Sequence, residues 1–132
     1  MEKIYYESGI LKGEAPFNDG RENGVEKQYY ESGKIWYETT YVGDKKNGAY
    51  KEYFESGKLK REIPYNNDEV NGVDKEYYES GILQGEAPYK NDKENGIEKL
   101  YYESGKLKTE TPYTNGNAGV TINYDENGNE IK

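Results

Sequence analysis

The stretch YFESGKLKREIPY, residues 53–65, decides the fold because it recurs with small changes every 24 residues. Its copies are YYESGILKGEAPF at 5–17, YYESGKIWYETTY at 29–41, YYESGILQGEAPY at 77–89 and YYESGKLKTETPY at 101–113. Units therefore start at residues 5, 29, 53, 77 and 101, and a partial unit occupies 124–132. A fixed period of this kind is typical of arrays in which each unit packs on its neighbours. We expect residues 1–132 to form a single repeat array.

Each unit carries two turn signals, and these predict β-hairpins. The first signal is Glu-Ser-Gly; the second is a polar stretch that ends in Asn-Gly, at 18–24, 43–48, 66–72 and 91–96. Turns this frequent leave about 6–8 residues for each extended segment, and no segment keeps a helical period. The sequence therefore predicts an all-β array of antiparallel hairpins. The turn glycines, for which we expect positive φ angles, are Gly9, Gly33, Gly57, Gly81 and Gly105.

Charged residues select a register for the strands. If Ser32-Gly33 forms a two-residue loop, Lys27 faces Glu38. The same rule gives the pairs Lys3–Glu14, Lys51–Glu62, Lys75–Glu86 and Lys99–Glu110. A shift by one residue would place carboxylates opposite one another in most units, which is unfavourable. The five units together therefore favour the first register.

This register also sorts the side chains into two faces. It pairs Tyr30 with Ile35 and Tyr29 with Trp36. The face that carries Tyr30, Ile35 and Tyr41, with their equivalents, is more apolar and is the predicted core side. The other face carries the Lys–Glu pairs and a tyrosine row. Its candidate partner-binding residues are Tyr5, Tyr29, Trp36, Tyr53, Tyr77 and Tyr101. Tyrosine suits recognition because it gives a large contact area at low entropic cost. A ladder of rings that seals a thin sheet is the alternative interpretation.

Composition argues against catalysis. The chain has no His and no Cys, which removes the imidazole base, soft metal sites and disulfides. Its glutamates recur in every unit, as a structural pattern does and a single active site does not. We therefore expect no enzyme, no cofactor and no metal. Calcium binding by the Asn- and Asp-rich turns stays an open alternative, although their spacing differs from that of an EF-hand loop.

The acidic balance of the chain indicates what kind of partner fits it. The net charge is −8, with 26 acidic and 18 basic residues. Phosphate backbones and anionic membranes repel such a chain, so we expect a protein partner of basic character and no nucleic acid. No segment is long and apolar enough to insert into a membrane. Since the start of the chain lacks a signal-peptide pattern, we expect a cytoplasmic protein, or an exported one if it derives from a longer precursor.

These units resemble the MORN repeat in its bacterial variant. The resemblance rests on the aromatic-x-x-Ser-Gly-Lys-Leu pattern of YYESGKLKTETPY and on the Asn-Gly region of NGVEKQYYESGK at 23–34, and it covers residues 2–132. It implies stacked hairpins that form an elongated, twisted, single-layer antiparallel sheet. It also implies an interaction or scaffold role, and some bacterial members are described as antitoxin-like.

The sequence therefore predicts a non-enzymatic protein-interaction or scaffold module that binds its partner through an acidic, tyrosine-rich surface. An antitoxin- or immunity-like role is one form of this function. The alternative is a surface-exposed, adhesin-like or carbohydrate- and cell-wall-binding repeat protein. Sugar-binding hairpin repeats of similar length rely on tryptophan, however, and this chain has only Trp36.

Overall fold

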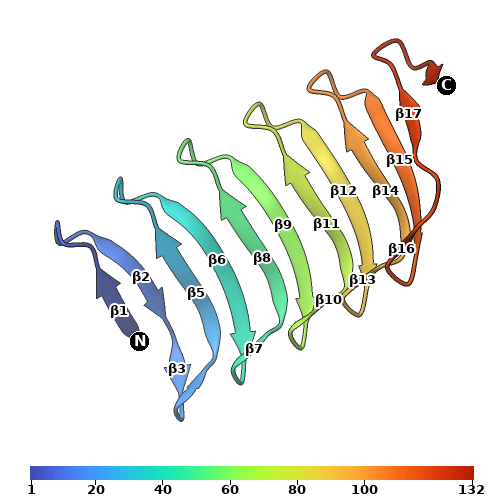
Figure 1. Ribbon diagram of the computed structural model, residues 1–132. Helices are drawn as coiled ribbons and strands as arrows, with labels where there is room; N and C mark the ends of the chain where they lie inside the picture. Colours follow the sequence, from blue (N-terminus) through green and yellow to red (C-terminus); the bar gives the residue numbers. More distant parts are fainter.

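The computed structural model describes residues 1–132, which form strands and turns but no helix. Hairpins stack one after another into a long antiparallel sheet, and the two ends of the chain lie at opposite ends of it (Figure 1). The sheet is a single layer, and its strands are bent along their length (Figure 1). The predicted all-β, antiparallel architecture is confirmed.

Twelve strands follow one another across the sheet. In spatial order they are β1 (Glu2–Tyr5), β2 (Leu11–Ala15), β5 (Gly24–Tyr29), β6 (Ile35–Val42), β8 (Gly48–Tyr53), β9 (Leu59–Asn66), β11 (Gly72–Tyr77), β12 (Leu83–Lys90), β14 (Gly96–Tyr101), β15 (Leu107–Thr114), β17 (Ile122–Tyr124) and β18 (Glu130–Ile131). Short strands β7 (Lys45–Lys46), β10 (Glu69–Val70), β13 (Lys93–Glu94) and β16 (Asn117–Ala118) pair with β6, β9, β12 and β15. Strands β3 (Phe17–Asn18) and β4 (Arg21–Glu22) pair only with each other.

The Glu-Ser-Gly turn is longer than the sequence predicted. The Gly33 N–H donates to the Tyr30 carbonyl at 2.9 Å, and the Tyr30 N–H donates to the Lys34 carbonyl at 2.8 Å. The loop therefore has three residues, 31–33, and ends in a glycine with positive φ. The predicted two-residue loop is wrong, but the predicted glycine conformation is confirmed in all five units. The φ angles are 87° at Gly9, 87° at Gly33, 92° at Gly57, 94° at Gly81 and 90° at Gly105.

A β-bulge follows each of these turns and restores the predicted register. Tyr29 pairs with Ile35 and Gln28 with Tyr37, which leaves Trp36 as the extra residue. The predicted pairs Tyr29–Trp36 and Tyr30–Ile35 are therefore wrong, and Ile35 lies on the same face as Tyr29. The other units correspondingly pair Tyr5 with Leu11, Tyr53 with Leu59, Tyr77 with Leu83 and Tyr101 with Leu107. Beyond the bulge, all five predicted Lys–Glu positions are opposite one another.

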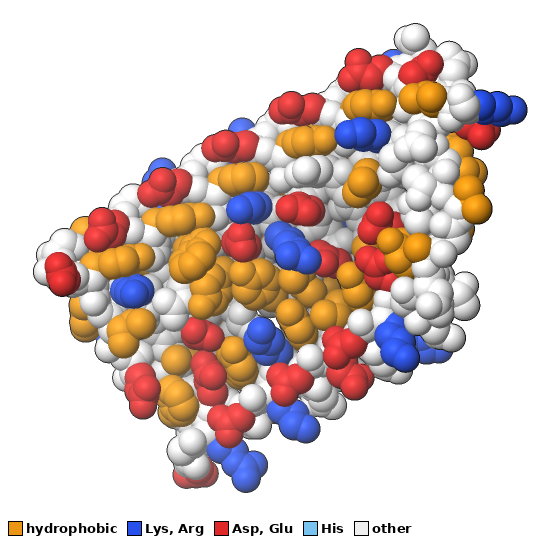
Figure 2. Space-filling view, viewed as in Figure 1, with side chains coloured by type: hydrophobic (Ala, Val, Ile, Leu, Met, Phe, Trp, Pro, Cys, Tyr) orange, Lys and Arg blue, Asp and Glu red, His pale blue; other side chains and the backbone are white.

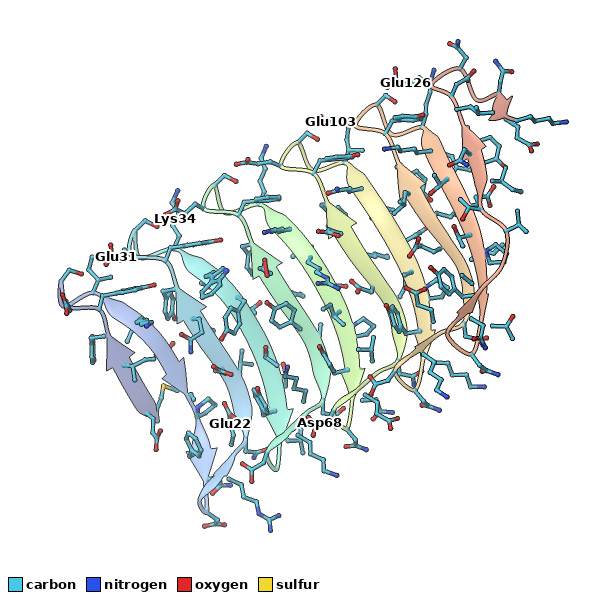
Figure 3. The ribbon with its side chains drawn as sticks, viewed as in Figure 1. Glu22, Glu31, Lys34, Asp68, Glu103 and Glu126 are labelled. Atoms are coloured by element: carbon cyan, nitrogen blue, oxygen red, sulfur yellow. The ribbon has the colours of Figure 1, made fainter.

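The second turn of each unit is a two-residue hairpin turn at the opposite edge. Both central residues have positive φ, as at Asn67 (49°) and Asp68 (70°), which is the type I′ geometry suited to twisted strands. The aspartate of such a turn also accepts a hydrogen bond from the backbone beside the preceding turn of the same kind. For example, the Lys46 N–H donates to Asp68 Oδ1 at 2.8 Å. Figure 3 shows Glu22 and Asp68 at this edge, and Glu31, Lys34 and Glu103 at the Glu-Ser-Gly edge.

The sheet has no conventional hydrophobic core. Only five residues are buried, and they lie at strand positions that share one face: Gly13, Thr39, Ile63, Gly85 and Thr111. This is the face of Tyr41, the predicted core side, but the bulge has removed the Leu and Ile row from it. Stability therefore depends on contacts between neighbouring hairpins, as expected of a repeat array.

Candidate interaction surface

One face of the sheet carries a continuous row of alternating lysine and glutamate. The pairing inside each hairpin continues into the next, because Glu14 also pairs with Lys27 and Glu38 with Lys51. The row is Lys3, Glu14, Lys27, Glu38, Lys51, Glu62, Lys75, Glu86, Lys99 and Glu110. Opposite charges alternate along it, so the row is neutral and favours this strand pairing. We call this side the Lys–Glu face.

The predicted tyrosine row lies on the Lys–Glu face, where its hydroxyls join neighbouring repeats. Each bonded hydroxyl donates to a glutamate of the preceding unit. The bonds are Tyr29–Glu14, Tyr53–Glu38, Tyr101–Glu86 and Tyr124–Glu110, with lengths of 2.8, 3.0, 2.9 and 2.9 Å. Burial, followed by the bonded carboxylate, raises the pKa of Tyr29, Tyr53 and Tyr101 to about 12. These hydroxyl donors are therefore engaged within the array.

A second set of tyrosine bonds runs in the opposite direction. The second aromatic residue of a unit donates its hydroxyl to the backbone carbonyl of the first tyrosine in the next unit. These bonds are Tyr6 to Tyr29, Tyr30 to Tyr53, Tyr78 to Tyr101 and Tyr102 to Tyr124, each 2.7 Å long. The third unit has Phe54 at this position and lacks the hydroxyl. Together the two sets hold the hairpins to one another near the Glu-Ser-Gly edge.

Trp36 does not belong to the tyrosine row. Its ring centroid lies 5.0 Å from that of Tyr37 and 6.0 Å from that of Tyr30. Tyr37 pairs with Gln28 and so lies on the face opposite Tyr29. The structure therefore places the predicted contact residues on two faces. That a partner contacts the tyrosine row stays a prediction.

Figure 2 shows hydrophobic and acidic side chains gathered on the opposite side of the sheet, which we call the tyrosine–carboxylate face. Its tyrosines are Tyr37, Tyr41, Tyr50, Tyr65, Tyr89 and Tyr113. Its carboxylates are Glu2, Glu22, Glu26, Glu52, Asp74, Glu76, Glu94 and Glu98. Its cations are Lys46 and Arg61 in the same rows and Lys12, Lys60 and Lys108 over aromatic rings near the Glu-Ser-Gly edge. This face therefore carries eight carboxylates and five cations, whereas the Lys–Glu row is neutral.

A hollow of about 180 Å³ opens on this face over the fourth unit. Small residues line it, because Gly85 and Ala87 stand where the third unit has Arg61 and Ile63. Tyr89 also lines it, and its hydroxyl donates to Glu94 at 3.0 Å. The other acidic residues of this face that line the hollow are Asp74, Glu76 and Glu98. The hollow is thus a mainly acidic recess beside a tyrosine, and Arg61 is the one cation that lines it.

Burial, followed by neighbouring carboxylates, raises pKa values on this face. Burial, and then the nearby Glu94, raises the pKa of Glu98. Arg61 relieves the crowding in part: its Nη2 donates to Asp74 Oδ2 at 2.7 Å and its Nε to Oδ1 at 3.2 Å. That hydrogen-bonded pair raises the pKa of Arg61. Such a surface attracts cations, because negative charges close together stabilise a positive charge placed among them.

The structure arranges no group of three or more acidic side chains as a metal site. It also contains no helix long and apolar enough to cross a membrane.

The repeats themselves contain a signal for the tyrosine–carboxylate face that the sequence argument missed. Positions that join hairpins barely change between units, as the Lys–Glu row shows. Several positions on the tyrosine–carboxylate face vary, although the position of Tyr41 stays aromatic: the equivalents of Gln28 are Ile4, Glu52, Glu76 and Leu100. A position that the array needs cannot vary in this way, so variation between units marks side chains that the fold leaves free.

The model of the MORN repeat variant matches five successive segments of the chain, residues 1–19, 22–42, 46–67, 71–91 and 94–115. The chain therefore belongs to the MORN repeat family. Repeats of this family are non-catalytic modules that commonly mediate contacts with proteins or membranes. No curated protein matches the chain.

Proposed function

We propose that this chain is a non-enzymatic interaction module that binds a basic protein through its tyrosine–carboxylate face. The segregation of charge carries the proposal. The Lys–Glu face is neutral along its central row, and its bonded tyrosines hold the array together. The tyrosine–carboxylate face has surplus acid, and its rings supply contact area for a partner. Antitoxin- or immunity-like masking of a basic protein is one form that such binding takes.

The shape of the surface favours a polypeptide over a small ligand. Adjacent strands lie about 4.8 Å apart, so a face of ten or more strands extends roughly 50 Å. The tyrosines and carboxylates recur along that length. A basic segment of a partner can therefore lie across several repeats, while anionic lipid headgroups are repelled.

Titration calorimetry with an arginine- and glycine-rich peptide tests the proposal, with two variants that remove the same charge from opposite faces. Glu76→Gln changes the tyrosine–carboxylate face, and Glu62→Gln changes the Lys–Glu face one strand away. Neither side chain makes a direct hydrogen bond or ion pair in the structure. We expect Glu76→Gln to weaken binding about two- to fivefold, the effect of one partly exposed charge pair, and Glu62→Gln to have a smaller effect.

Equal losses in the two variants would show that the peptide responds only to net charge. Absence of peptide binding at about 0.05 M salt would contradict the proposed basic partner. Circular dichroism of both variants is the control for folding.

A further inference from the structure

The tyrosine hydrogen bonds between repeats recur at every junction except one. Four of the five junctions contain both tyrosine hydrogen bonds near the Glu-Ser-Gly edge. The junction where the hairpin β8–β9 meets the hairpin β11–β12, between β9 and β11, contains neither. Phe54 has no hydroxyl to donate to the Tyr77 carbonyl, and the Tyr77 hydroxyl forms no hydrogen bond with Glu62 or any other group.

The absence of the bond from residue 54 results from the residue type and not from a displaced ring. Lys60 Nζ lies 5.7 Å from the Phe54 ring centroid, as Lys12 lies 5.5 Å from Tyr6 and Lys108 lies 5.6 Å from Tyr102. The turn bond from the Phe54 N–H to the Lys58 carbonyl is also 2.8 Å, as at the equivalent Tyr30. A hydroxyl added to Phe54 would therefore point where the other units make their 2.7 Å bonds.

An ion pair crosses this junction instead. Arg61 on β9 and Asp74 on β11 form the pair described above, which joins two hairpins, whereas the other ion pair, Lys60–Glu52, lies within the hairpin β8–β9. The side chain of Arg61 is 44% exposed and that of Asp74 is 11% exposed, so dissolved salt reaches the pair from one side. Screening weakens exposed charge pairs but leaves neutral hydrogen bonds largely unchanged.

We propose that the β9–β11 junction is the joint of the array and that Arg61–Asp74 is its salt-sensitive latch. The sheet opens there before it opens at the other internal junctions. The strands before this junction and the strands after it then move as two blocks. Because the latch lies on the tyrosine–carboxylate face, movement at the joint changes the curvature of that face. The joint is a property of the fold and does not depend on the proposed partner.

Hydrogen exchange of the intact chain, followed by mass spectrometry, tests the joint. We expect the amides between β9 and β11, corrected for intrinsic rates, to exchange faster than those between β6 and β8 or between β12 and β14. Raising the salt from about 0.05 M to about 0.5 M widens that difference. Phe54→Tyr restores a hydrogen bond and slows exchange at the joint about two- to tenfold. Asp74→Asn speeds it and removes most of its salt dependence.

Tyr30→Phe is the matched control, because it removes the same hydroxyl from the β6–β8 junction. This variant should open β6–β8 faster and leave β9–β11 unchanged. The joint is contradicted if wild-type β9–β11 amides are protected as well as their equivalents, or if Phe54→Tyr leaves their exchange unaltered. A uniform effect of salt on all junctions would contradict the latch.

Discussion

At the scale of single residues, tyrosine has two different roles in this chain. On the Lys–Glu face Tyr53 donates to Glu38, and Tyr29, Tyr101 and Tyr124 repeat the bond. On the other face Tyr50 donates to Glu52 within its own strand and leaves its ring beside Tyr37. Both faces carry recurring aromatic residues, because the position of Tyr41 is also aromatic in all five units. The recurrence of a tyrosine therefore does not by itself separate a structural role from a binding role.

Tyr53→Phe should lower the free energy of unfolding by about 1–2 kcal/mol at neutral pH, because the Glu38 carboxylate loses its donor. The matched control is Tyr77→Phe, which removes a hydroxyl without a hydrogen bond and should cost much less. Urea denaturation of both variants measures the difference.

The same bond predicts a pH dependence. The pKa of Tyr53 is raised from 10 in the unfolded chain to about 12 in the fold, so its contribution is fully present below pH 10. It is lost as the pH rises towards 12, and the advantage of the wild type over Tyr53→Phe should shrink over that range. A constant difference up to pH 12 would contradict the hydrogen bond.

At the scale of elements, the turn explains both the success and the failure of the sequence argument. The Lys–Glu pairs follow from alternation along the strands, which the sequence shows directly. The loop length does not: two-residue and three-residue loops both accept Ser-Gly, and the difference moves Trp36 from one face to the other. The Lys–Glu pairs lie beyond the bulge, and the bulge offsets the extra loop residue. The pairs therefore have the same register with either loop length, so they could not reveal the bulge.

Glycine has a second role at the other end of each hairpin. Gly72 begins β11 with a φ of 129°, and a Cβ added there would lie 2.8 Å from Pro64 Cγ. Gly57 has a φ of 92°, but a Cβ at that position would meet no atom within 4 Å. A side chain at Gly57 would therefore cause backbone strain alone, whereas one at Gly72 would cause both backbone strain and a steric clash.

Gly57→Ala should cost about 1–2 kcal/mol of unfolding free energy through backbone strain alone. Gly72→Ala should cost more, by about 1–3 kcal/mol, because the proline ring must also shift. Thermal and urea unfolding of the two variants provide the comparison. Equal costs would show that the sheet moves Pro64 aside without resistance.

At the scale of the whole molecule, the array is a single layer whose two faces differ in composition. The period of 24 residues was enough to predict the architecture, because repeats that are alike must stack alike. The candidate surface could be predicted only in character, as acidic and tyrosine-rich. Its location could not, because the alternation of side chains shows which residues share a face but not which face the fold leaves free for a partner.

Paramagnetic relaxation in NMR tests the central claim, that a basic partner lies on the tyrosine–carboxylate face. The probe is the arginine- and glycine-rich peptide with a nitroxide label, and the observed signals are those of the tyrosine rings in the intact chain. The two faces of the sheet point away from each other, so rings on the occupied side broaden first. We predict the strongest broadening for Tyr37, Tyr50 and Tyr89. Stronger broadening of Tyr29, Tyr53 and Tyr101 would contradict the account and return the contact surface to the Lys–Glu face.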